Sequence, residues 1–385
     1  MIRPKIPAVF AHLALCCTAV LSAFAADATP PLNVHQFTGA QSCASSSCHG
    51  GGARNEFLTY SRKDRHVFAA GILGKGTSLK IAEALGIGDP TKAAQCTVCH
   101  SPMEAVPASR LAVRLKPAPD QKPVPDRGVS CEACHGAAGE WLLFHTRKDV
   151  NYQQILGTGL RDLIDINGRA NVCVACHLNI DEPIRQAGHP ELFFELDAQA
   201  MLEPPHYVDA RPSLGPRSWL TGQAVALREM SWKLAAKRDD RLVARWKALV
   251  WLLQMTESGA KELPSGEDFS AMQPAADRLA RKASRELWTR SQIASQMKRF
   301  ASAHQEFTDV KTDRTDQRRR AELLVPAIDR LWAALRKEGG VAIPDFEKAL
   351  KSLADLSREG DDFAPTQFAD ALGKLEAEIA SALKL

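Results

Sequence analysis

The residues of this chain whose type and spacing could do chemistry are paired cysteines followed directly by a histidine, a pattern that occurs four times between residues 43 and 177. The four copies are Cys43-Ala-Ser-Ser-Ser-Cys48-His49, Cys96-Thr-Val-Cys99-His100, Cys131-Glu-Ala-Cys134-His135 and Cys173-Val-Ala-Cys176-His177. A Cys-x-x-Cys-His sequence is typical of c-type haem attachment, in which two thiols bond to the porphyrin and the histidine binds its iron. The motifs therefore predict four covalently bound c-type haems, each with the histidine of its own motif as the first axial ligand.

Of the ten cysteines, only Cys16 and Cys17 lie outside these motifs. Both fall within residues 1–25, which begin with the charged Arg3 and Lys5, continue with an apolar run and end on a small-x-small sequence. This pattern is typical of a secretory signal peptide, with a retained membrane anchor as the alternative. Disulfides or zinc are alternative uses of paired cysteines, but neither explains a histidine after every second cysteine.

Composition sets broad limits on the class of protein. The 385 residues carry a formal charge of +4, with 24% charged and 45% hydrophobic residues, which is ordinary for a soluble protein. No basic tract indicates nucleic-acid binding. Because residues 1–25 predict export, the expected compartment is the periplasm. Because the motifs predict haems, the expected partners are other redox proteins.

Five further histidines in the same part of the chain are candidates for the second axial ligands. They are His35, His66, His145, His189 and His206. A second histidine makes a low-spin, electron-carrying haem, whereas an open position lets the iron bind and transform a small molecule. Five histidines are enough to close four irons, so the count favours electron transfer through closely packed, mostly bis-histidine haems over catalysis.

Around the motifs the sequence predicts short helices separated by irregular loops. One helix is expected over 55–74, with Asn55 as its cap and His66 on a face lined by small residues, and another over 77–86. Six prolines between the second and third motifs predict an extended loop. We expect the haems themselves to supply much of the core of a domain over 26–215.

The character of the chain changes near residue 216. Beyond it there is no cysteine, and His304 is the single histidine. Apolar residues at helical spacing begin at Leu242, Leu324, Phe346 and Phe368, and a longer apolar segment covers 268–305. This pattern predicts a bundle of about five or six helices over 216–385, with tryptophans and methionines in its core. The expected fold class is mainly α: an irregular haem-packed N-terminal domain with short helices, followed by an α-helical bundle.

A cluster of charge interrupts the apolar pattern of the bundle at residues 311–320, KTDRTDQRRR. It is interpreted as a solvated turn, with a docking patch for an acidic redox partner as the alternative. The bundle as a whole would also suit docking to a membrane or periplasmic redox complex.

The third motif carries a family resemblance. Residues 131–145, CEACHGAAGEWLLFH, preceded by Gly128-Val-Ser, resemble the third haem site of a tetrahaem cytochrome c family. The best-known member of that family accepts electrons from hydroxylamine oxidoreductase. The family also has a histidine on a helix shortly after the first site and another beyond the fourth. The resemblance covers residues 35–210 and does not extend to the helical C-terminal part.

The resemblance implies a crossed ligation. His145 would bind the iron of the first motif, His66 that of the third, and His206 or His189 that of the fourth. In the family the second haem, here that of His100, is high-spin with an open distal side. An open haem would suit an enzyme acting on a small nitrogen compound, which is the alternative function.

The chain departs from the family pattern in three places. The first motif has a spacer of four residues rather than two, both His189 and His206 are present, and His35 precedes the first motif. An extra histidine could close the second iron, and an electron carrier would result.

Overall fold

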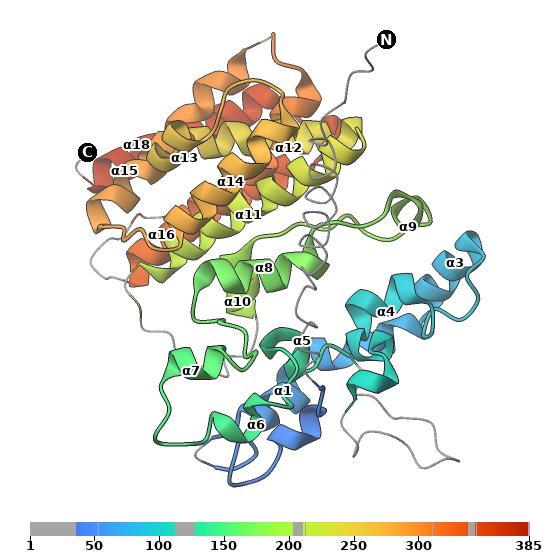
Figure 1. Cartoon of the computed structure of the whole chain (residues 1–385). Coiled ribbons are helices and arrows are strands. Elements are labelled where there is room, and N and C mark those ends of the chain that lie inside the picture. The colour runs from blue at the N-terminus through green and yellow to red at the C-terminus, as the bar shows by residue number, and fades with distance from the viewer. Residues whose placement is uncertain are drawn as a thin grey trace, which may run out of the picture.

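The computed structural model describes residues 36–52, 54–111, 128–202, 211, 213–309, 311–337, 343 and 345–383. The expected signal peptide and most of the proline-rich loop lie outside them. The fold of the described residues is mainly α, as predicted, and their β-structure is a single bridge between Phe37 and Leu111. The helices are α1 (Glu56–Lys63), α2 (Ala69–Leu73), α3 (Gly76–Leu85), α4 (Ala94–His100), α5 (Cys131–His135), α6 (Trp141–Phe144), α7 (Tyr152–Leu156), α8 (Ile166–His177), α9 (Glu182–Gln186), α10 (Leu196–Leu202), α11 (Leu214–Ala236), α12 (Asp240–Gln254), α13 (Glu257–Glu262), α14 (Phe269–Ala283), α15 (Arg290–Ala301), α16 (Arg314–Lys337), α17 (Phe346–Ser357) and α18 (Pro365–Leu383). Figure 1 shows short helices in the N-terminal part and long helices packed together in the C-terminal part.

Three of the four motifs lie in helices. α4 ends at His100 and α8 at His177, while α5 consists of the third motif alone. Residues three apart share a helix face, so the two cysteines of each of these motifs lie on one side of the helix. The first motif, with its longer spacer, follows a 3-10 turn that ends at Cys43. The backbone N–H of His49 donates to the Cys43 carbonyl at 3.1 Å and closes this motif into a compact loop.

The helix expected over 55–74 is interrupted. It consists of α1, a 3-10 turn over Arg65–Phe68 and α2. The break is at Asp64, whose backbone is extended and whose buried carboxylate accepts the N–H of His66 at 2.8 Å. An aspartate that bonds the following backbone in this way caps a new helical turn and ends the previous one. The second expected helix of this region is confirmed as α3.

The C-terminal part is a bundle of eight helices within the described residues, α11 to α18, rather than five or six. The expected segment 268–305 is two of these, α14 and α15. α11 lies at the centre and packs against α8, α10, α12, α14 and α16. Its Trp219 meets Phe300 of α15 edge to face, with ring centroids 5.6 Å apart. Trp246 and Met272 are buried in the core, as predicted.

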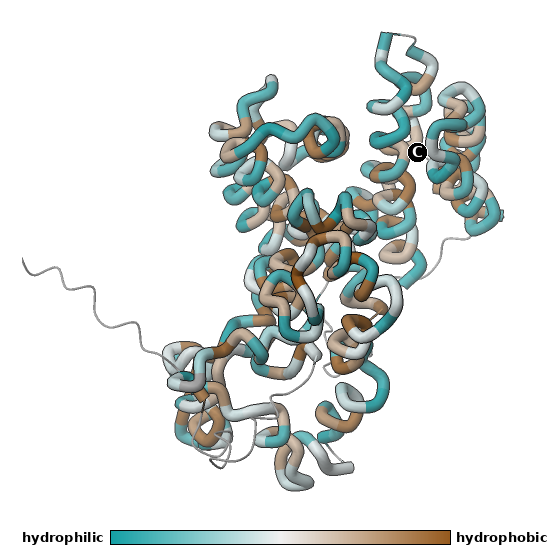
Figure 2. Tube along the Cα trace, turned by 90° about the vertical axis from the view of Figure 1, so that its right-hand side faces the viewer, coloured by the Kyte–Doolittle hydropathy of each residue, from teal (hydrophilic) through white to brown (hydrophobic). Residues whose placement is uncertain are grey.

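A single hydrophobic cluster joins the bundle to the fourth motif. Among the described residues it runs from Ile166 of α8 to Ile379 of α18, and it includes Phe194 and Leu196 beside the start of α10. The helix that ends in His177 therefore packs on the bundle, as Figure 1 shows for α8 and α11. Figure 2 shows hydrophobic and hydrophilic residues alternating along the bundle helices, as expected when one face of each is buried. Composition changes near residue 216, but the hydrophobic packing continues across that point.

The charged run at 311–320 is a turn, as expected from its composition, only over its first three residues. α16 begins at Arg314. Arg318 and Arg319 each form an ion pair with Glu322, with nitrogen–oxygen distances of 2.8 Å. Pairs three or four residues apart lie on neighbouring positions of one helix, so the run is stabilised as helix. Separately, no helix in the described ranges has the length and apolar character needed to cross a membrane.

Candidate haem-binding sites

The eight motif cysteines all lie among the described residues, and no disulfide joins any of them. Cys43 is buried and the others are half-buried. A hydrogen bond joins Cys99 of the second motif to Cys176 of the fourth, so these two motifs meet. Four pairs of thiols are the donor set that thioether attachment of four porphyrins requires.

Six of the predicted ligand histidines form three close pairs, each joining a motif histidine to one from elsewhere in the chain. The ring centroids are 6.2 Å apart for His49 and His145, 5.9 Å for His66 and His177, and 6.4 Å for His100 and His189. The angles between the ring planes are 6°, 87° and 64° in the same order. All six side chains are half-buried.

The separation within each pair fits one iron bound between two imidazoles. A metal–imidazole bond is about 2 Å long and a ring centroid lies about 1 Å behind its nitrogen, so two ligands on opposite sides of one metal have centroids about 6 Å apart. All three pairs have this separation. Two axial imidazoles can take any rotation about the line that joins them through the metal, so parallel and perpendicular ring planes are both compatible with it.

The second ring nitrogen of each paired histidine is held by the protein. Nδ1 lies beside a carboxylate in His49 (Glu56, 3.1 Å) and His66 (Asp64, 3.1 Å), beside a backbone carbonyl in His100 (Ala69, 3.3 Å), His145 (Trp141, 2.9 Å) and His189 (Pro190, 2.8 Å), and beside the Gln199 amide in His177 (3.5 Å). In five of the six an oxygen partner at Nδ1 fixes the tautomer, so Nε2 is the nitrogen that would bind a metal. The exception is His177, whose Nδ1 faces the amide nitrogen of Gln199, a donor.

Burial lowers the pKa of two motif histidines, His100 and His177. At His100 the hydrogen bond to Ala69 opposes this effect and the neighbouring ring of His189 adds to it, while at His177 the ring of His66 adds to it. A lowered pKa keeps an imidazole neutral near neutral pH, and the neutral form is the one that coordinates iron.

The pairing agrees with the family resemblance at the first motif and differs from it at two others. His145 lies against the histidine of the first motif, as the resemblance implies. His66, which the resemblance assigns to the third motif, lies against His177 of the fourth. His189 lies against His100 of the second motif, on the haem whose distal side is open in the family.

The histidine of the third motif lies at the end of a short helix. His135 ends α5 and is half-buried, and its carbonyl accepts the N–H of Arg161 at 2.9 Å. His35 and His206, the other two predicted second ligands, lie outside the described residues.

Sequence reasoning missed one residue of the third motif, Glu132. Its side chain is fully buried, and its carboxylate accepts the backbone N–H groups of Thr38 at 2.9 Å, Gly39 at 2.6 Å and Ala138 at 2.6 Å. Thr38 and Gly39 lie just before the first motif, so Glu132 ties the first motif to the third. Only tertiary structure buries this acid, and no local pattern in the sequence would have marked it.

Comparison with known proteins gives one similarity. Residues 42–136 match the sequence model of the family described as "Cytochrome c554 and c-prime". No curated protein and no solved structure is similar to the chain. The match contains the first three motifs and ends one residue after His135. It supports a multihaem c-type cytochrome with covalently bound haem and redox partners, and it does not reach the fourth motif or the bundle.

Proposed function

We propose that this protein is an exported, periplasmic tetrahaem c-type cytochrome that transfers electrons between redox partners through closely packed, mostly bis-histidine haems. The observation that carries the proposal is the set of three histidine pairs, whose ring centroids are 5.9, 6.2 and 6.4 Å apart. The four motifs support the number of haems, and the signal-like segment 1–25 supports export.

The N-terminal domain, residues 26–215, would hold the four haems. The thioether bonds would come from Cys43 and Cys48, Cys96 and Cys99, Cys131 and Cys134, and Cys173 and Cys176. A bound haem supplies an iron that cycles between its ferric and ferrous states. The chain fixes the ligands: the carboxylates at Nδ1 of His49 and His66 orient these rings.

His189 is the reason to favour electron transfer over catalysis. An enzyme acting on a small nitrogen compound at His100 would need an open coordination position. The centroid separation of 6.4 Å between His189 and His100 supports His189 as the second ligand of this iron. We propose that this iron is six-coordinate, and that His35 or His206 completes the iron of His135.

The wild-type holoprotein should show low-spin ferric signals from all of its haems, because every sixth position would be taken by a protein nitrogen. After reduction it should bind carbon monoxide slowly or not at all. The measurements are an EPR spectrum with spin integration and a carbon monoxide titration followed in the Soret band. A high-spin ferric signal amounting to one haem in four, with stoichiometric carbon monoxide binding, would support the enzyme instead.

A further inference from the structure

One chain segment, residues 180–193, links the helical bundle to the second motif and is named here the His189 arm. We infer that the bundle uses this arm to position His189 as the second ligand of the iron at His100, with Arg245 as the main positioning residue. The inference rests on the proposed function, since it requires a haem at His100.

The arm begins on the bundle and reaches the helices of the second haem. At its start, Lys233 of α11 donates to the carbonyl of Ile180 at 2.7 Å. The arm then forms α9, which contacts α3. Figure 1 shows α9 reaching away from the bundle. The backbone N–H of His189 donates to the carbonyl of Ile184 at 3.2 Å, so His189 is fixed directly to the end of this short helix.

Arg245 of α12 holds the segment just after His189. Its side chain is 7% exposed, and Nη1 donates to the carbonyl of Leu192 at 2.6 Å. The guanidinium carbon lies 4.3 Å from the centroid of the Phe193 ring, and Nη1 lies 3.8 Å from Oε1 of Glu191. Burial lowers the pKa of Arg245 to about 10, so it stays charged at neutral pH. A buried charge is costly unless it is paired, so these contacts fix the three residues to α12.

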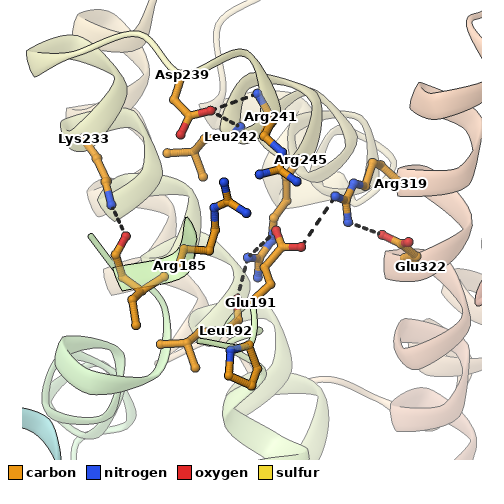
Figure 3. Close-up of polar contacts among 12 residues, drawn as sticks. Arg185, Glu191, Leu192, Lys233, Asp239, Arg241, Leu242, Arg245, Arg319 and Glu322 are labelled. Carbon is orange, nitrogen blue, oxygen red and sulfur yellow. Dashed lines mark hydrogen bonds and ion pairs between the residues drawn. The ribbon is translucent and has the colours of Figure 1, made fainter. Parts of the chain in front are cut away.

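A second arginine of the bundle contacts the same segment. Nη2 of Arg319 in α16 lies 3.5 Å from Oε2 of Glu191, while its Nη1 lies 2.8 Å from Glu322. Figure 3 shows Glu191 between Arg245 and Arg319, so that one carboxylate of the arm meets arginines from two different helices of the bundle. Both arginine side chains are largely buried, 7% and 13% exposed, whereas Glu191 is 41% exposed. Each ion pair therefore joins a buried guanidinium to a carboxylate that solvent partly screens.

These contacts act on the ligand through a short path. Glu191 is two residues from His189, and Nδ1 of His189 lies 2.8 Å from the carbonyl of Pro190. The ring orientation is therefore set by the same backbone that Arg245 and Arg319 hold. Ligands supported by rigid helices are placed more accurately than ligands on unsupported loops. Loss of the arginine contacts should let the arm move and His189 leave the iron more often.

The test is the rate at which carbon monoxide binds to the reduced holoprotein, measured by stopped flow in the Soret band. At a six-coordinate haem carbon monoxide must wait for the protein ligand to leave, so this rate reports how firmly His189 is held. Arg245→Met removes the hydrogen bond and the charge but keeps an unbranched apolar stem, and we expect binding at one haem to become about 10- to 100-fold faster. Arg245→Lys should give a smaller acceleration, because an ammonium lacks the planar fork of a guanidinium.

Arg318 and Arg319 provide a matched pair of variants. Both bond Glu322, but within the described contacts only Arg319 reaches Glu191. We expect faster carbon monoxide binding in Arg319→Met and the wild-type rate in Arg318→Met. If Arg245→Met does not fold, as judged by circular dichroism, Arg245→Lys and the two variants Arg318→Met and Arg319→Met test whether the arginine contacts position His189.

Equal rates in all of these variants, with unchanged haem mass, would overturn the inference and leave the proposed function intact. Immediate carbon monoxide binding by the wild-type protein would instead overturn the proposed ligation at His100, and the inference with it.

Discussion

His189→Ala is expected to convert one haem per protein from six-coordinate to five-coordinate. The ring of His189 is the one that lies against His100, and no other described histidine ring pairs with His100. Removal of this imidazole would leave the iron with a single axial ligand. The ferric protein should then show a high-spin signal from a quarter of its haem, and the ferrous protein should bind one equivalent of carbon monoxide at once.

The matched control is His304→Ala. His304 belongs to the bundle, where its Nε2 lies 3.1 Å from Glu376, and it is not part of any histidine pair described above. This variant should keep the wild-type EPR spectrum and the wild-type resistance to carbon monoxide. If His189→Ala behaved like His304→Ala in both measurements, His189 would not be an iron ligand.

Glu132→Ala is expected to have the largest effect on stability. The substitution would leave three buried backbone N–H groups without their acceptor and would separate the first motif from the third. Loss of a buried, multiply bonded charged acceptor costs about 3–5 kcal/mol of the free energy of unfolding. Urea unfolding of the holoprotein, followed by far-UV circular dichroism, measures this cost.

The control for that experiment is an acid at the surface. Glu83→Ala, on the exposed face of α3, should change the free energy of unfolding by less than about 0.5 kcal/mol. Glu132→Gln should fall between the two, because its amide oxygen can still accept some of the same hydrogen bonds. Equal stability of Glu132→Ala and Glu83→Ala would show that the buried carboxylate does not hold the two motifs together.

Local patterns in the sequence predicted the parts of the fold that depend on nearby residues. The apolar spacing from Leu242 and Leu324 predicted α12 and α16, because a helix buries residues three and four apart. The same reasoning failed at Asp64, where a side chain caps a new turn inside an otherwise helical pattern. It also failed at 311–320, where partners three and four residues away turn a charged run into helix.

Which histidine lies beside each motif histidine depends on contacts between distant parts of the chain. Local sequence patterns could not predict these contacts. His66 and His177 are brought together by the packing of separate segments, and no spacing rule connects them. The family similarity ends at residue 136, so His177 and His189 lie beyond it. The structure differs from the resemblance at these two histidines. The bundle that holds the His189 arm also lies beyond the matched residues. Its contacts with the arm are a physical reason why the pairing of His189 differs from the one that the resemblance implies.

Covalent attachment of haem at all four motifs is tested most directly by the intact mass of the purified mature protein. The predicted mass is that of the chain without residues 1–25 plus four haems, with all eight motif cysteines resistant to thiol alkylation. A mature chain with no added haem mass, or with fewer than three haem equivalents and alkylatable motif cysteines, would contradict it.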